Sequence, residues 1–320
     1  MGHVTDVDQH PPRVLVVGDA NPDLILRGDV TPRFGQAEQL LDDADLVIGG
    51  SAAITAHGVA RLGRPVALLA AVGDDPFGHQ LDGELGLAGV DTRFLLVRQG
   101  IRTGITVILS RADDRAILTL PGAIPTLSAA DVRAAVDALR PTGLVHVHVA
   151  SLFLQPGLAE GLADLLAWLR SAGLTTSLDT NDDPARRWRG VDALLPHLDV
   201  LLPNSAEAIA LAGEPDALAA AAKLAARGPL VVVKDGARGG FAVRSSGHAV
   251  HATPRHRPVV DTTGAGDTFN AAFLDAWLDG SDVDICLDRA VLAGAHSVSA
   301  PGGTAGQPRR DDLEPEGTHT

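Results

Sequence analysis

The segment at residues 261–269, Asp-Thr-Thr-Gly-Ala-Gly-Asp-Thr-Phe, combines residue types and spacing that could perform chemistry. Apolar residues recur at helical spacing from Phe269 onward, which predicts a helix that begins here. The backbone N–H groups of Gly264, Ala265 and Gly266 would converge at the helix N-terminus, where unpaired donors and the helix dipole favour an anion. The carboxylate of Asp267 would stand beside them, within reach of an incoming hydroxyl. This pattern suits transfer of a phosphoryl group to an alcohol.

The same segment also has a purely structural interpretation. Gly-Ala-Gly can be an ordinary loop, and Asp267 can be an acid in the first helical turn that stabilises the helix by roughly a few tenths of a kcal/mol. Taken alone, these residues favour neither interpretation over the other.

Two segments near the N-terminus bring polar groups and glycines to places where a ligand could bind. Asn21 and Asp23 follow the first predicted strand, although Asn, Pro and Asp there would also suit a simple turn. Gly49 and Gly50 form a pair that lets the backbone approach a ligand closely. The alternative is a tight strand-to-helix turn with Ser51 as the N-cap.

Further along the chain, polar residues follow two more predicted strands. Asn204 and Glu207 offer the oxygen ligands that Mg²⁺ prefers, with Glu207 acting through water, whereas helix capping and a first-turn acid are the structural alternative. Lys234 ends another strand and leads to Gly236 and Gly239, and a lysine at a strand end is compatible with a bound anion. A surface charge explains such a lysine equally well when its context is ignored.

Taken together, these segments resemble the ribokinase-like (PfkB) family of carbohydrate kinases. Residues 261–269 are similar to the family's C-terminal signature, and the other segments resemble family segments in the same order, across roughly residues 13–304. The resemblance implies ATP-dependent phosphorylation of a hydroxyl on a small sugar or sugar-like acceptor. In that reaction Asp267 would be the base and residues 264–266 the anion hole.

The resemblance also implies how ligands are held. The acceptor would contact Asn21, Asp23, Gly49, Gly50, Ser51, Ile54, Arg102 and Asp267. ATP would contact Asn204, Lys234, Gly236, Gly239, Gly264, Gly266 and Gly303, and Mg²⁺ would be held by Glu207 and Asn204. Asp261 and Thr263, with carbonyl groups near Val298 and Gly303, would form a site for a monovalent cation such as K⁺.

One position departs from the family pattern. Ile54 stands where sugar kinases of this family usually have an asparagine that bonds ligand hydroxyls, and a hydroxyl left unpaired there would cost about 1–3 kcal/mol. The acceptor could instead carry an apolar part such as a nucleobase, which makes a nucleoside kinase the alternative. Arg102 could meet the carboxylate of a sugar acid such as 2-keto-3-deoxygluconate, or it could be an exposed lid arginine.

Other classes of protein fit the sequence less well. A non-catalytic sugar- or nucleotide-binding protein would need neither Asp267 nor the glycine cradle. Residues 18–21 lack the Gly-x-Gly-x-x-Gly of a nucleotide-binding oxidoreductase, and the chain has no P-loop segment. His146 and His148 alternate along a strand instead of following zinc-ligand spacing, so packing or surface roles are expected for the histidines.

The elements that must position these residues alternate between strands and helices, which predicts an α/β fold with a central, mostly parallel sheet. Nearly continuous apolar runs predict buried strands at residues 14–18, 65–72, 144–149, 174–179, 200–202 and 230–234. Helical patterns occupy residues 128–139, 157–169 and 216–226. Strand-like runs at 94–97, 105–109 and 116–120 predict a small β-sheet lid formed by about 24–47 and 92–120.

The composition of the chain makes some classes of binding partner improbable. The net charge of −14 disfavours binding to nucleic acid or to anionic membranes, and no apolar run reaches the roughly 20 residues of a membrane span. The single cysteine, Cys286, is expected to be a buried apolar residue in a cytoplasmic protein. Residues 13–304 are expected to form a single domain between flexible termini at 1–12 and 305–320. Exposed lid strands could pair in a homodimer.

Overall fold

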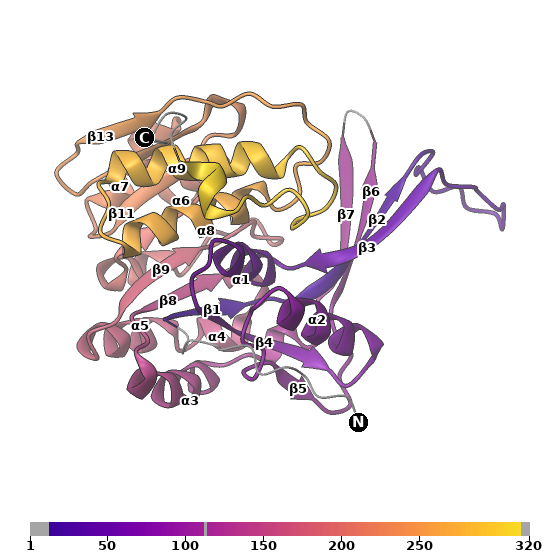
Figure 1. Ribbon diagram of the computed structural model, residues 1–320, viewed down its shortest axis with the longest axis horizontal. Helices are drawn as coiled ribbons and strands as arrows, with labels where there is room; N and C mark the ends of the chain where they lie inside the picture. Colours follow the sequence, from indigo (N-terminus) through magenta and orange to yellow (C-terminus); the bar gives the residue numbers. More distant parts are fainter. Residues whose placement is uncertain (1–12, 112–113, 315–320) are drawn as a thin grey trace.

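The computed structural model describes residues 13–111 and 114–314 (Figure 1). Within them, a nine-stranded sheet has the order β13-β12-β11-β10-β9-β8-β1-β4-β5. The pairs from β11 to β5 are parallel, whereas β12 and β13 add antiparallel strands at one edge. The predicted α/β class and all six predicted buried strands are confirmed. The strands are β1 Val14–Gly18, β4 Val66–Gly73, β5 Leu96–Arg98, β8 His146–Ala150, β9 Thr175–Asp179, β10 Val200–Leu201, β11 Leu230–Lys234, β12 Gly240–Val243 and β13 Ala249–Ala252.

Helices cover both faces of this sheet because its central strands are apolar on both faces. In β1, Leu15 and Val17 belong to the cluster under α3 and α5, whereas Val14 and Val16 pack on the side of α1 and α8. The helices are α1 Ser51–Arg61, α2 Pro76–Leu87, α3 Ala129–Leu139, α4 Pro156–Ala159, α5 Leu162–Ser171, α6 Ser205–Ala212, α7 Ala217–Ala225, α8 Ala265–Leu278 and α9 Val283–Ser297. Short 3-10 turns include η1 Ile124–Thr126, η3 Leu152–Leu154, η6 Gly236–Arg238 and η7 Arg310–Leu313.

A separate lid sheet projects from one side of this α/β body (Figure 1). In the described part of the chain it has four strands, in the order β3-β2-β6-β7. β2 pairs antiparallel with β3 and parallel with β6, and β7 forms a hairpin with β6. The lid predicted from the strand-like runs is therefore confirmed. Its strands are β2 Asn21–Arg27, β3 Asp43–Gly49, β6 Ile105–Ser110 and β7 Arg115–Leu120.

Two local predictions were wrong. The run at 94–97 was assigned to the lid, but β5 pairs with β4 in the main sheet, and both Phe94 and Leu96 pack against the main core. A strand of three residues carries too little pattern to identify its partner. The helix predicted at 157–169 is broken into α4 and α5, because Gly161 is the N-cap of α5 and lies against Ala129.

The C-terminal segment also differs from its prediction. Residues 305–314 were expected to be loosely ordered, but Gln307 is buried and donates to the carbonyl of Ile54 and the hydroxyl of Thr268. Leu313 is buried as well. Polar composition concealed this packing, since Gln307 is held by hydrogen bonds and not by apolar contact. Residues 1–12 and 315–320 lie outside the described range.

The parallel arrangement brings the functional segments to one edge of the sheet. β1, β9 and β11 are parallel members of the same sheet, so their carboxyl ends at Gly18, Asp179 and Lys234 face the same way. Ligands of open α/β sheets bind outside this edge. The N-terminus of α8 lies there too, because Gly266 approaches the side chain of Lys234.

Candidate active site

The residues assigned to the acceptor near the N-terminus lie where the lid meets the body. Asn21 and Asp23 lie on strand β2 and are buried, so the turn considered for them is not what they form. The Asn21 amide donates to Asp23 Oδ1 at 2.8 Å and to Thr106 Oγ1 at 3.1 Å. The Asp23 carboxylate lies directly over Gly49, where a Cβ atom would collide with it. Burial, and then the charge of Asp19, raises the pKa of Asp23 to about 7.

Asp19 at the end of β1 anchors the start of α1. Its Oδ1 accepts from the Ala52 amide at 3.0 Å, and its carbonyl accepts from the Ala53 amide at 3.2 Å. Gly50, not Ser51, is the N-cap of α1, with a φ of 86° that suits glycine. A Cβ at Gly50 would lie 2.8 Å from the Asp19 carbonyl oxygen. The glycine pair is therefore required by this close backbone packing, whatever else it does.

Asp267 lies in the first turn of α8, whose N-cap Gly264 has a φ of 71°. The amides of Gly266 and Asp267 belong to the turn in which backbone donors lack intrahelical partners. The buried Asp267 carboxylate accepts a hydrogen bond from the Ser51 hydroxyl, which in turn accepts from the Asn181 amide at 3.1 Å. The carboxylate and the glycine cradle thus lie together, beside the acceptor residues of α1.

A buried ion pair stands next to Asp267. The ammonium of Lys234 bonds the carboxylate of Asp179, which also accepts from the Asn270 amide at 2.6 Å. Burial, followed by the charge of Asp179, raises the pKa of Asp267 to about 7, against the opposing effects of Ser51 and Lys234. A carboxylate with such a pKa is suited to act as a general base near neutral pH.

Glu207 and Asn204 form a reciprocal capping box at the start of α6. Glu207 accepts from the Asn204 backbone at 2.8 Å and from its side-chain amide at 2.6 Å, while Asn204 Oδ1 caps the Glu207 amide. The capping role considered for them is therefore real. Burial, and then the charge of Asp179, raises the pKa of Glu207 to about 7. Capping does not by itself explain why an acid is buried beside another acid.

The charges of this cluster fit a hydrated magnesium ion. The carboxylates of Asp179, Glu207 and Asp267 share the neighbourhood of the Lys234 ammonium. Within residues 13–111 and 114–314, no group of three or more His, Cys, Asp or Glu side chains is close enough to hold a metal directly. Mg²⁺ often keeps several of its waters, so Glu207 would act on it through water.

A cavity of about 300 Å³ opens beside the N-terminus of α8. Lys234, Gly236, Gly239 and Gly266, which were assigned to ATP, line it, whereas Asn204, Gly264 and Gly303 do not. Sequence reasoning missed the basic residues that also line it after β13, Arg255, His256 and Arg257. Their signal was a cluster of three basic side chains within residues 255–257.

The residues assigned to a monovalent cation, Asp261 and Thr263, lie in the loop before α8. Asp261 accepts from the amides of Thr263 at 2.8 Å and Gly302 at 3.0 Å. Burial would raise the pKa of Asp261, but these hydrogen bonds outweigh it and lower the pKa. The Val298 carbonyl accepts from the Asp261 amide at 3.2 Å. Arg115 of lid strand β7, which the sequence did not single out, donates to the Thr263 hydroxyl at 3.1 Å and ties the lid to this loop.

Two residues assigned to the acceptor have other surroundings. Ile54 is buried, and its side chain fills the space next to Gly264 and Gly303, where an added Cβ at Gly303 would lie 2.5 Å from Ile54 Cδ1. Arg102 is exposed on the loop between β5 and β6.

His146 and His148 are core residues whose rings bond the Ser177 hydroxyl, which confirms their expected packing role. Cys286 is buried, also as expected.

Known proteins resemble this chain over nearly its whole length. Residues 11–310 match the model of the pfkB family carbohydrate kinases. A ribokinase of Bacillus subtilis is 30% identical over 303 residues, which cover 94% of this chain and 98% of the relative. An Arabidopsis thaliana ribokinase complexed with ribose and ATP is 25% identical, with a TM-score of 0.80 and coverage of 95% and 97%. An E. coli protein complexed with ATP and Mg²⁺ has a TM-score of 0.82 at 23% identity, with coverage of 94% and 97%.

These matches define the class of protein, a phosphotransferase with an alcohol acceptor. The chain belongs to the pfkB family of carbohydrate kinases. The expected family is therefore confirmed. No described helix is long and apolar enough to cross a membrane.

Proposed function

We propose that this protein transfers the terminal phosphoryl group of ATP to a hydroxyl of a small sugar or sugar-like acceptor, with Asp267 as the general base. The observation that carries the proposal is the place of Asp267. Its buried carboxylate has a pKa raised to about 7 by burial and Asp179, and it lies in the first turn of α8 next to the Gly264–Ala265–Gly266 cradle.

The protein's own groups divide the work. Asp267 accepts the proton of the acceptor hydroxyl as that oxygen attacks. The amides of residues 264–266 stabilise the negative charge that develops on the transferred group. Lys234, in the nucleotide cavity, offsets phosphate charge. Glu207 and Asn204 would hold Mg²⁺ through water, and this ion would neutralise charge shared between the phosphates. Asp261 and Thr263 would complete a monovalent-cation site beside the cradle.

The acceptor would lie under the lid, against Asn21 and Asp23. Both side chains are buried, and the Asn21 amide, which also donates to the Thr106 hydroxyl, fixes the orientation of Asp23. Oriented carboxyl and amide groups can recognise hydroxyls by hydrogen bonds, and a hydroxyl missing from the acceptor would leave them unpaired. Ser51 would hold Asp267 in position until the hydroxyl arrives.

The test measures ADP release from ATP and Mg²⁺ across a panel of sugars, sugar acids and nucleosides. We expect one acceptor class to stimulate turnover and Asp267→Asn to lower kcat by about 10³-fold, as general-base catalysis contributes on that order. The panel also decides between a sugar kinase and a nucleoside kinase.

If Asp267→Asn kept full turnover, Asp267 would not be the general base. If no acceptor stimulates turnover while a sugar or nucleotide still binds, the protein is a binding protein that has kept the fold. Asp164→Asn serves as a matched control, since this substitution also removes one carboxylate, whereas Asp164 is exposed on α5 and lines neither cavity.

We also propose that a second copy of this chain covers the outer lid strand. β7 is the last strand in the lid order, and all six of its residues are exposed. Ile117, Leu118 and Leu120 are 55%, 59% and 51% exposed. An apolar edge strand is a template for pairing with another strand, and a homodimer would satisfy it.

A further inference from the structure

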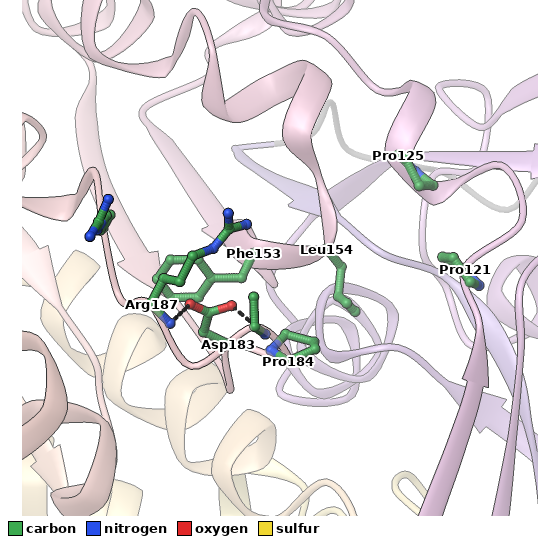
Figure 2. Close-up of a pocket in the computed structure, with 9 residues that line it drawn as sticks. Pro121, Pro125, Phe153, Leu154, Asp183, Pro184 and Arg187 are labelled. Carbon is green, nitrogen blue, oxygen red and sulfur yellow. Dashed lines mark hydrogen bonds between the residues drawn. The ribbon is translucent and has the colours of Figure 1, made fainter.

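A second cavity, of about 440 Å³, lies outside the cluster around Asp267 (Figure 2). Its walls come from the end of lid strand β7, from η1, from η3 after β8 and from the loop after β9. We call it the arginine pocket and define it by its lining residues Pro121, Pro125, Phe153, Leu154, Asp183, Pro184, Ala185, Arg187 and Arg189.

The arginine pocket borders the acceptor site through one loop. Asn181, two residues before Asp183, donates to the same Ser51 hydroxyl that bonds Asp267. Asn181 Oδ1 also accepts from the Ser151 amide at 2.9 Å, which ties the loop after β9 to the loop after β8. A ligand group in this pocket would therefore be joined to the acceptor site by the loop that holds Asn181, and the pocket shares no lining residue with the cavity lined by Lys234.

The wall that carries the arginines is held in an unusual backbone conformation. Asp183 accepts from the amides of Ala185 at 2.9 Å, Arg187 at 2.6 Å and Trp188 at 2.7 Å. Arg186 and Trp188 both have φ values near the left-handed helix, at 53° and 52°. Such residues cost of order 1 kcal/mol each and persist where the surroundings fix them, often at ligand sites. The Trp188 ring packs edge-on against Phe153, with centroids 5.5 Å apart.

The chemistry of the lining selects an anion on an apolar body. Pro121, Pro125, Phe153, Leu154 and Pro184 supply apolar surface, and Figure 2 places the two lid-side prolines across the pocket from Arg187. The Asp183 carboxylate accepts from three backbone amides, and the charge of Arg187 helps to lower its pKa, so the lining combines one carboxylate with two arginines and keeps an excess of positive charge. Among the described residues, no carboxylate pairs with the exposed side chains of Arg187 and Arg189, whereas the neighbouring Arg186 pairs with Asp182 at 3.0 Å.

We propose that the arginine pocket binds the non-reacting end of the acceptor, and that this end is an apolar group bearing a carboxylate or a phosphate. The proposal rests on the proposed function, because the phosphorylated hydroxyl must reach Asp267. Guanidinium groups bind both anions through paired N–H donors, and apolar walls around them exclude competing water. The exposed Arg102, assigned earlier to such an anion, is not among the lining residues.

The first test measures binding and needs no turnover. Phenyl phosphate and benzoate are titrated into the intact protein by calorimetry with ADP and Mg²⁺ present, and benzyl alcohol is the neutral control. We expect an anionic probe to bind more tightly than benzyl alcohol, and the preferred probe identifies phosphate or carboxylate. The Arg187→Gln/Arg189→Gln variant should raise the Kd of that probe about tenfold, as loss of charge-assisted hydrogen bonds at a partly exposed site does. Arg186→Gln, on the same loop but outside the lining, should leave the Kd unchanged.

The second test uses the acceptor found in the kinase panel. The double arginine variant should raise KM for an anionic acceptor about tenfold with kcat and the KM for ATP unchanged, since uniform binding is lost. Benzyl alcohol binding as tightly as both anions, or wild-type affinity in the double variant, would overturn the inference. These outcomes differ from failure of the proposed function, in which turnover does not depend on Asp267.

Discussion

At the scale of single residues, the pKa values of the buried acids in the site depend on one another, because Lys234 is the basic residue placed among them. Lys234 bonds Asp179, while Glu207 and Asp267 lie close enough for their carboxylates to be affected by the charge of Asp179. Removing acids from water favours their protonated forms, and a neighbouring negative charge adds to this effect. Asp179 therefore has two functions, since it fixes the position of Lys234 and makes Asp267 more basic.

The rate should accordingly depend on pH near neutrality. A general base accepts a proton only when it is deprotonated. Burial, and then the negative charge of Asp179, raises the pKa of Asp267 to about 7. We expect kcat/KM to rise with pH up to about 7 and then to level off, because kcat/KM reports the free enzyme. Asp179→Asn removes a negative charge that raises this pKa, so it should move the acid limb to lower pH by roughly one unit.

Asp182→Asn is the matched control for this shift. Asp182 is exposed, lies in the same loop region and pairs with Arg186, and it is not among the groups that raise the pKa of Asp267. Its pH profile should match that of the wild type. A profile that stays flat down to pH 5 would show that no group with a raised pKa limits the reaction.

At the scale of elements, α1 and two glycine loops are packed as one unit. Ile54 of α1 lies against Gly264 at the start of α8 and against Gly303 in the loop after α9. Gln307 ties the same region together, since it bonds Ile54 on α1 and Thr268 on α8. The isoleucine that departs from the family pattern thus has a packing role that supports the anion cradle.

This packing predicts a coupling between Ile54 and Gly303. A Cβ at Gly303 would lie 2.5 Å from Ile54 Cδ1, so Gly303→Ala should lower the free energy of unfolding by about 1–3 kcal/mol through overpacking. Ile54→Val removes that methyl group and should cost about 1 kcal/mol alone. The double variant should be less destabilised than the sum of the two, by roughly 1 kcal/mol in a denaturant-melt cycle.

Gly83→Ala on α2 is the control for the alanine substitution, since nothing lies within 4 Å of its added Cβ. Alanine is the better helix former, so this variant should be neutral or slightly stabilising. Strictly additive losses in the Ile54 and Gly303 cycle would mean that the loop moves away from α1 at no cost.

Sequence patterns predicted the elements that carry their own signal. The buried strands are continuous apolar runs, and α3 and α7 lie within the helical patterns predicted at 128–139 and 216–226. The pairing of β5 and the packing of Gln307 depend on contacts with distant residues, which no local pattern records. Asp179 was seen only as the end of a strand, because its role comes from Lys234, 55 positions away.

At the scale of the whole molecule, the lid joins both ends of the site. Strand β2 carries Asn21 and Asp23, and Arg115 of β7 bonds Thr263 in the loop before α8. Closing a lid over a phosphoryl-transfer site excludes water that would otherwise accept the phosphoryl group. The lid sheet can exclude water only if its strands keep their arrangement. Its outer strand β7 has a neighbouring strand on one side only in the described chain.

The proposed pairing of β7 with a second copy of the chain agrees with the difference between the two edges of the lid sheet. The opposite edge strand, β3, carries Asp43 and Asp45 in ion pairs with Arg27, and charged edges resist further pairing. By contrast β7 exposes Ile117, Leu118 and Leu120. Light scattering should therefore give twice the mass of one chain for the wild type. Leu118→Glu should give a single-chain mass, because a charge would be buried between two apolar strands.

The control places the same charge on an exposed leucine outside the lid. Leu87 at the end of α2 is 92% exposed, so Leu87→Glu should keep the mass of the wild type. If Leu118→Glu also has a higher KM for the acceptor, pairing of the lids and binding under them are linked, since β7 pairs with the β6 strand that holds Thr106. A wild type that remains a single chain at all concentrations would mean that β7 stays exposed, and that the lid keeps its shape through β2, β3 and β6 alone.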